Sequence, residues 1–455
     1  MALRASDTTP TRDIEVDLRP VPGAGAPLRS AHGEPGLELE VPDAGPEYGQ
    51  LVLSIDDSGG IRWHLPEPLD AATAAPSGTR GGGAVRRFRI PATLPPPPPG
   101  ATGLQQRSLI GAVGKRVLKV LVYPFSDAVL GYAVDLFARR WEEQKRPHRL
   151  RRFAPADYMA GDAPNLAPAE LASMSAAGPV LLFVHGTFST AHAAFGDLPL
   201  PAMTQLHERY GGRVIAFDHP TLADDPKANV QWLLQQLPPG MQADIVSHSR
   251  GGLVSRLLVE RPASFGLPST PVQVRRLVLA GVPNAGTLLA DKDHMVDMID
   301  RLTTVLTLFP SGAAAETLEA VITAVKMLGR GVLTGLDGLV AMQPRGAFVR
   351  NLNIAGGAAS ASYYAVASDY EPNDRGLRAI VSGAADNLLD FVFENSGNDL
   401  VVPTQGVHAR NGHASFPIAD DRVHLLARTE GAMHTSLFAQ PSVEAKLLEW
   451  LTDEA

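Results

Sequence analysis

The sequence predicts an α/β fold built on a doubly wound, mostly parallel sheet, and three observations predict it. First, apolar runs of strand length recur after residue 178, as is typical of parallel strands buried on both faces. Second, segments with helical spacing of apolar residues lie between these runs. Third, one run leads through small residues directly into a helical segment. The expected strands cover residues 179–184, 213–218, 243–246, 277–282 and 363–367.

The part of the chain before this pattern divides into three segments that differ in composition and in the spacing of apolar residues. A segment rich in Pro, Gly, Ala and charge predicts disorder. Alternating apolar residues then predict a small β-rich module that ends in a proline-rich linker, and apolar residues at three- and four-residue steps predict a helical connector. The expected divisions are residues 1–46 (disordered), 47–100 (β module, with the linker at 95–100), 101–177 (connector) and 178–455 (α/β domain).

The composition excludes several classes of protein. The chain has 455 residues, 45% of them hydrophobic and 19% charged, which suffices for a large buried core. A net charge of −8 argues against a nucleic-acid partner. The absence of cysteine excludes disulfides and thiolate chemistry. Without the apolar core of a signal peptide in residues 1–20, the expected location is cytoplasmic.

A basic run at residues 145–152 follows the apolar helical pattern of the connector. An apolar helix beside a basic patch is typical of peripheral membrane contact. Packing of this segment against the following domain is the favoured interpretation, and the membrane contact is retained as an alternative. A protein partner for the β module is left unknown.

Ser249 is the candidate nucleophile. It lies in the turn between the strand at 243–246 and the helical segment at 252–260, where a serine is held on a strained elbow with its hydroxyl exposed. Such a turn needs small residues two positions before and after the serine. Gly251 meets this need, and Ser247 takes the place that glycine usually has.

A serine nucleophile needs a histidine base and an orienting carboxylate, which follow it along the chain in this architecture. His434 lies between the last expected strand and the last expected helix and is the candidate base. Asp399 is the favoured acid. Asp369, which directly follows an apolar strand, is kept as the alternative.

Backbone N–H groups are expected to form the oxyanion hole. One comes from Arg250, the residue after the nucleophile, and the other from the loop after the first strand of the domain. In that loop Phe188 is preferred and Thr187 is second, while His185 is assigned a structural role. The polar residues 291–294 are interpreted as the start of a helix, so no metal and no cofactor are assigned.

Taken together, these segments resemble the α/β-hydrolase superfamily, specifically its bacterial lipase- and esterase-like members. The resemblance covers about residues 178–450, and it implies that Ser249, Asp399 and His434 form a catalytic triad. A leucine at position 400, where such lipases often carry glycine, is one departure from the pattern. Helical apolar spacing at 291–353 looks like the cap or lid of a lipase, with plain helical packing as the alternative.

The expected function is hydrolysis of carboxylic esters or lipids through an acyl-enzyme on Ser249. Phospholipase, thioesterase, amidase and acyltransferase reactions use the same elbow and stay open. A further alternative is a catalytically inactive relative that serves as a binding or scaffold protein.

Overall fold

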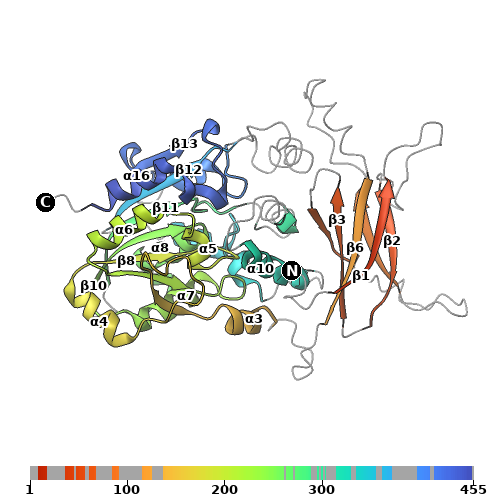
Figure 1. The fold of residues 1–455 in the computed structure, drawn as a ribbon, viewed down its shortest axis with the longest axis horizontal. Helices are drawn as coiled ribbons and strands as arrows, with labels where there is room; N and C mark the ends of the chain where they lie inside the picture. Colours follow the sequence, from red (N-terminus) through yellow and green to blue (C-terminus); the bar gives the residue numbers. More distant parts are fainter. Residues whose placement is uncertain are drawn as a thin grey trace, which may run out of the picture.

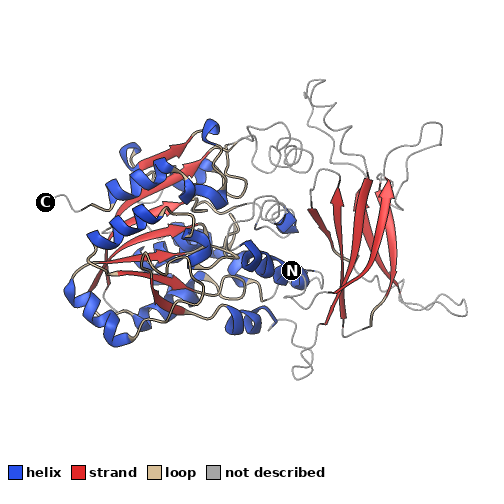
Figure 2. Ribbon diagram, viewed as in Figure 1, coloured by secondary structure: helices blue, strands red, loops and turns tan. Residues whose placement is uncertain are grey.

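The computed structural model of the protein contains an α/β unit with helices on both sides of a sheet and a smaller module made of strands (Figures 1 and 2). The chain enters through the small module and finishes in the larger unit. The structure describes residues 9–17, 36–45, 48–56, 61–67, 85–91, 115–124, 137–260, 263–269, 272–287, 290, 295–296, 299–300, 303, 314–328, 335–354, 361–370, 397–409 and 415–452.

The large sheet has seven strands and confirms the predicted parallel architecture. In chain order they are β7 (Arg149–Arg152), β8 (Val180–Val184), β9 (Val214–Asp218), β10 (Met241–His248), β11 (Val272–Ala280), β12 (Ser362–Ser368) and β13 (Val423–Leu426). Their order across the sheet is β13-β12-β11-β10-β8-β9-β7, and every neighbouring pair is parallel except the edge pair β7–β9. The winding direction reverses between β8 and β10, and in such sheets ligands bind beyond the strand ends at that point.

Helices cover both faces of this sheet because its strands are apolar on both sides. Along β8, Leu182 packs into one core cluster and its neighbour Leu181 packs into another. The first cluster includes α7 (Pro226–Gln236) and α8 (Arg250–Glu260), and the second includes α6 (Leu200–Arg209) and α16 (Pro441–Trp450). The other described α-helices are α3 (Phe137–Lys145), α4 (Pro168–Ala177), α5 (Ala191–Phe195), α10 (Ala314–Leu328), α11 (Asp337–Val340), α12 (Ala347–Ile354) and α15 (Thr404–His408).

Four short 3-10 helices complete the described elements. They are η2 (Ala263–Phe265), η5 (Asp420–Arg422), η6 (Arg428–Glu430) and η7 (His434–Ala439). The last of them begins at the predicted base His434, between β13 and α16.

The N-terminal module is a small sandwich of two antiparallel sheets. Its strands are β1 (Thr9–Asp17), β2 (Gly36–Pro42), β3 (Tyr48–Asp56), β4 (Ile61–His64), β5 (Val85–Pro91) and β6 (Lys115–Pro124). One sheet has the order β1-β6-β3-β4, and the other is the pair β2-β5. Buried residues of both sheets, such as Val52, Phe88 and Val120, form a separate core.

The outer face of the four-stranded sheet packs against the predicted cap segment. The main-chain N–H of Trp63 donates to Asp300 Oδ1 at 2.8 Å, and its indole N–H donates to Thr303 at 3.1 Å. The Tyr123 hydroxyl donates to the carbonyl of Lys326, in α10, at 3.0 Å. The cap segment is therefore in contact with the N-terminal module.

Two predictions for the N-terminal part are wrong in secondary structure. β6 is a strand where a helical connector was expected. It is the inner strand between β1 and β3, so apolar side chains on both of its faces are buried and imitate helical spacing. β1 and β2 lie in the segment predicted to be disordered, and each pairs with a strand far along the chain that local composition does not reveal. The proline-rich linker at 95–100 lies outside the described residues.

The α/β sheet begins earlier than residue 178, because β7 forms its antiparallel edge. Arg146, Arg149 and Arg151 of the basic run lie within this unit and donate to main-chain carbonyls there. Packing was the favoured interpretation of this run. Among the residues that the structure describes, no helix combines the length and apolar character needed to cross a bilayer.

Candidate active site

The turn after β10 has the geometry of a nucleophile elbow. β10 ends at His248, α8 begins at Arg250, and Ser249 between them has a φ of 53°. This left-handed conformation is unfavourable for a residue with a side chain. The N–H of Ser249 donates to the carbonyl of Ala280 at 2.9 Å, which holds the elbow on the neighbouring strand.

Two glycines make the elbow sterically feasible. A Cβ atom on Gly251 would lie 2.4 Å from the carbonyl oxygens of Val184 and His185. A Cβ atom on Gly186 would lie 2.6 Å from the Cβ of Ser249. Both distances are shorter than a real contact allows, so β8, its following loop and the elbow approach each other through backbone alone.

The serine at the first elbow position also has a structural explanation. Ser247 is fully buried, and its hydroxyl donates to the carbonyl of Val278 at 2.8 Å. The neighbouring strand therefore satisfies the hydroxyl group, which a glycine at this position would not have. The side chain of Arg250 is buried as well and donates to the Gly338 carbonyl and to Asn229, each at 3.0 Å. It anchors the start of α8.

The structure brings the predicted acid and base together. The Nδ1–H of His434 donates to Asp399 Oδ2 at 2.7 Å. The other carboxylate oxygen accepts the N–H groups of Val401 and Val402 at 3.0 and 2.7 Å. With Nδ1 carrying the proton, Nε2 of a neutral His434 has a free lone pair and can act as a base.

This pair lies beside the elbow. A Cβ atom on Gly281 would be 3.1 Å from both His434 Nδ1 and Asp399 Oδ2. His248 donates its Nε2–H to the carbonyl of His434 at 3.0 Å, and the two rings are 4.8 Å apart. Neither the Ser249 hydroxyl nor His434 Nε2 makes a hydrogen bond with another residue in the described part of the chain.

The alternative acid is occupied elsewhere. Asp369 accepts from Arg428 Nε at 2.8 Å and makes no contact with His434. Asp399 therefore has the geometry expected of the acid. Leu400, the departure noted in the sequence, has a φ of 81°, which explains why glycine is favourable at this position.

The loop predicted to supply an oxyanion donor, residues 186–190, follows β8 and lies against the elbow, and we refer to it as the oxyanion loop. The N–H of Phe188, the preferred donor, already donates to Thr221 Oγ1 at 3.2 Å. The N–H of Thr187 makes no hydrogen bond with the described residues and is available. The N–H of Arg250 lies in the first turn of α8, where helical N–H groups have no acceptor within the helix.

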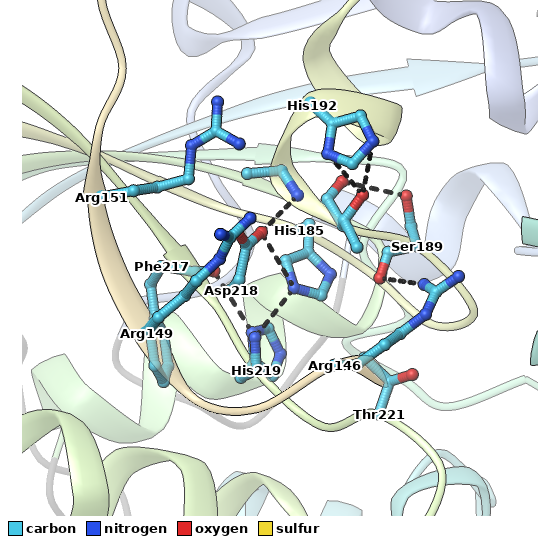
Figure 3. A network of polar contacts seen from close by, with 12 residues as sticks. Arg146, Arg149, Arg151, His185, Ser189, His192, Phe217, Asp218, His219 and Thr221 are labelled. Atoms are coloured by element: carbon cyan, nitrogen blue, oxygen red, sulfur yellow. Dashed lines mark hydrogen bonds and ion pairs between the residues drawn. The ribbon is translucent and has the colours of Figure 1, made fainter. Parts of the chain in front are cut away.

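The histidines near the loop have supporting positions. His185 donates its Nδ1–H to the carbonyl of Gly186 at 2.9 Å. Its Nε2 accepts the N–H of His219 at 3.1 Å (Figure 3). Burial lowers the pKa of His185 to about 4, which keeps it neutral and agrees with a structural role. Burial also lowers the pKa of His248 to about 3.

Sequence reasoning missed two buried charged residues in this region. Arg146 donates to the carbonyl of Ser189 in the oxyanion loop, and Glu142 accepts the N–H of Thr221 in the loop after β9. Arg146 lies in the basic run, for which packing against the following domain was expected without any contact to this loop. The available signal was a Glu and an Arg spaced one helical turn apart in a segment with apolar neighbours, and that signal is too common to single them out.

No group of three or more histidine, aspartate or glutamate side chains suited to a metal ion occurs among the described residues. Residues 291–294, which were interpreted as a helix start, lie outside them.

Sheet topology, the serine elbow at the switch point and the paired aspartate and histidine define the class: this is an α/β-hydrolase fold with a Ser–Asp–His constellation. Within that class, the chain belongs to the family described as "Domain of unknown function (DUF7379)", whose model matches residues 145–452. The matched region begins just before β7, which is the first strand of the large sheet along the chain. No curated protein matches the chain.

Solved structures with detectable similarity include several bacterial enzymes at low identity. Lipase 1 from Pelosinus fermentans is 12% identical over 61% of this chain and 99% of its own, with a TM-score of 0.40. EstA from Clostridium botulinum is 11% identical over 61% and 88%, with a TM-score of 0.38. Staphylococcus hyicus lipase is 13% identical over 59% and 90%, with a TM-score of 0.36.

Proposed function

We propose that the protein is a serine hydrolase that cleaves carboxylic esters through an acyl-enzyme on Ser249. The observation that carries this proposal is the hydrogen-bonded Asp399–His434 pair beside a serine held at a φ of 53°. A serine hydroxyl becomes a strong nucleophile only when a base removes its proton, and the available Nε2 of His434 is suited to that task.

In the proposed reaction, Ser249 Oγ attacks the carbonyl carbon of the ester while its proton passes to His434 Nε2. The imidazolium that forms is stabilised by Asp399. The negative charge on the former carbonyl oxygen is stabilised by the N–H groups of Thr187 and Arg250. As the tetrahedral intermediate collapses, His434 returns the proton to the departing alkoxide. Water, activated by the same histidine, then releases the acid and regenerates the serine.

An acyl group bound at this site would meet apolar side chains. The Thr187 hydroxyl contacts the sulfur of Met342 at 3.5 Å, and Leu437 Cδ1 would lie 3.0 Å from a Cβ on Gly281. These neighbours favour an ester with an apolar acyl chain.

The decisive test is Ser249→Ala against Ser255→Ala. Ser255 is a buried serine in α8, six residues after Ser249, and its hydroxyl donates to the carbonyl of Gly251. Loss of the nucleophile should lower kcat for p-nitrophenyl butyrate by about 10⁶-fold, or to the detection limit. Circular dichroism and the melting temperature should stay close to those of the wild type.

A fluorophosphonate probe distinguishes the remaining alternatives. The wild type and Ser255→Ala should be labelled, and Ser249→Ala should not. A folded wild type that neither reacts with the probe nor hydrolyses esters would indicate a binding or scaffold relative instead. Thioester, anilide and phospholipid substrates, assayed in parallel, separate ester hydrolysis from the other reactions of this fold.

A further inference from the structure

Two charged side chains, one in α3 and one just after it, lie near the oxyanion loop and the loop after β9. Glu142 is fully buried and Arg146 nearly so, and the N–H of Arg146 donates to the carbonyl of Glu142 at 2.6 Å. Both precede the first parallel strand, and neither belongs to the Ser–Asp–His constellation. Buried charges are costly unless hydrogen bonds satisfy them, so their partners indicate what they hold.

Glu142 fixes the loop after β9. Its Oε1 accepts the N–H groups of Thr221 and Leu222 at 2.5 and 2.8 Å, and its Oε2 accepts that of Ala223 at 2.8 Å. Burial raises the pKa of this carboxyl group, while the three N–H groups oppose that rise. The hydroxyl of Thr221, positioned in this way, accepts the N–H of Phe188 at 3.2 Å.

Arg146 holds the same residue of the oxyanion loop from its other side. Its Nη1 donates to the carbonyls of Phe188 and Ser189 at 3.1 and 2.8 Å, and Figure 3 shows the guanidinium facing Ser189. Phe188 has a φ of 59°, a conformation that costs about 1–2 kcal/mol in a residue with a side chain. The N–H and the C=O of Phe188 are thus both fixed by hydrogen bonds. This restricts the direction of the N–H of the preceding residue, Thr187.

The same guanidinium also contacts the cap. Arg146 Nη2 donates to the carbonyl of Glu316, in the first turn of α10, at 2.5 Å. The carboxylate of Glu316 pairs with His192 Nε2 at 3.0 Å, just after the oxyanion loop. One buried arginine therefore joins α3, the oxyanion loop and the cap helix.

We infer that Arg146, supported by Glu142, is a positioning residue for the oxyanion hole: it ties residues 188–189 to α3 and α10 and thereby aims the N–H of Thr187. This inference rests on the proposed ester hydrolysis. Because the N–H bonds to a charge that develops only in the transition state, loss of its alignment should lower kcat with little change in KM.

The test compares Arg146→Lys with Arg151→Lys. Arg151 is a matched control because it is also buried and donates to main-chain carbonyls, those of Ala160 and Asp157 at 2.6 and 3.0 Å, away from the oxyanion loop. Lysine keeps the charge but loses the planar fork of donors. Arg146→Lys should lower kcat for p-nitrophenyl butyrate by about 10- to 100-fold, somewhat less than complete loss of an oxyanion donor, and Arg151→Lys should stay within about 3-fold of the wild type.

A second readout isolates the oxyanion hole from general damage. Sulfur is a weak hydrogen-bond acceptor, so a thionoester gains little from the hole, and the wild type should prefer the matching oxygen ester strongly. In Arg146→Lys this preference should shrink by about the same factor as kcat. A lysine variant with unchanged kcat, or one whose preference for the oxygen ester is unchanged despite a lower kcat, would overturn the inference. A wild type inert towards esters and fluorophosphonate would instead overturn the proposed function itself.

Thr221→Val and Thr221→Ser provide a second, milder pair should Arg146→Lys fail to fold. Valine removes the acceptor for the Phe188 N–H at nearly constant volume, and serine keeps it. The inference requires a lower kcat and a reduced preference for the oxygen ester in Thr221→Val, with recovery in Thr221→Ser. Equal activity of the two variants would contradict it.

Discussion

The two halves of the proposed catalytic centre are held in different ways. The serine, acid and base lie in loops that follow strands of the sheet, and main-chain hydrogen bonds together with close contacts between small residues hold them. The oxyanion loop is held by Arg146, which follows α3, and by Thr221, whose N–H donates to Glu142 of α3. The position of the serine, acid and base can therefore be predicted from local sequence patterns. The position of the oxyanion loop depends on contacts between segments that are distant in sequence.

After loss of the nucleophile itself, the largest effect should come from the acid in the first half. Asp399→Asn keeps the shape of the side chain but removes the charge that stabilises the imidazolium and sets the His434 tautomer, so kcat should fall by about 10⁴-fold. Asp369→Asn is the matched control. Its carboxylate pairs with Arg428, so ester hydrolysis should stay within about 2-fold of the wild type. The reverse result, in steady-state kinetics, would restore Asp369 as the acid.

A substitution where the halves touch should have an intermediate effect. A Cβ on Gly186 would lie 2.6 Å from the Ser249 Cβ and 3.1 Å from the His248 carbonyl oxygen. Gly186→Ala must therefore displace the elbow or the loop, and a shift of this kind lowers kcat by about 100-fold. Gly406→Ala is the control, because its nearest neighbour would be 3.6 Å away. Equal kcat for the two variants would show that the halves move independently.

The smallest effect concerns stability in mild acid. The pKa of His185 falls to about 4 in the folded protein, against 6.5 when unperturbed. A lowered pKa means that the unfolded chain binds the extra proton, so this contribution to stability is present above pH 6.5 and is lost as the pH falls towards 4. Its slope is at most about 1.4 kcal/mol per pH unit.

His185→Asn removes this titration beneath the oxyanion loop. Urea unfolding between pH 4 and 7 should show a lower free energy of unfolding for the variant at pH 7, and a shallower dependence on pH than the wild type has. His408→Asn is a suitable comparison, since His408 is half-buried and remote from the loop. Parallel curves for wild type and His185→Asn would contradict the assignment.

The contrast also explains which parts of the fold and of the candidate site could be predicted from the sequence. Continuous apolar runs predicted the parallel strands, and the spacing of small residues around Ser249 predicted the elbow, because both patterns arise from neighbours in sequence. His434 and Asp399 followed from the order of elements. The choice between Phe188 and Thr187 could not be made, because it depends on Thr221, which approaches Phe188 only in the folded chain.

Three N-terminal strands outside the predicted module, β1, β2 and β6, escaped prediction for a similar reason. β6 is apolar on both faces because it lies between two strands and two core clusters, so its pattern also fits a helix. β1 has a mostly polar sequence and acquires its structure through pairing with β6. Local propensity decides little when the partner strand lies far along the chain.

The position of β6 has a consequence for synthesis on the ribosome. β6 is the last strand of its sheet to be made, yet both β1 and β3 pair with it. The sheet can therefore close only after residue 124 has emerged, and its outer face, with Trp63 and Tyr123, stays uncovered until the cap segment is translated. Nascent chains that stop before α10 would expose that face and should depend on chaperones to stay unaggregated.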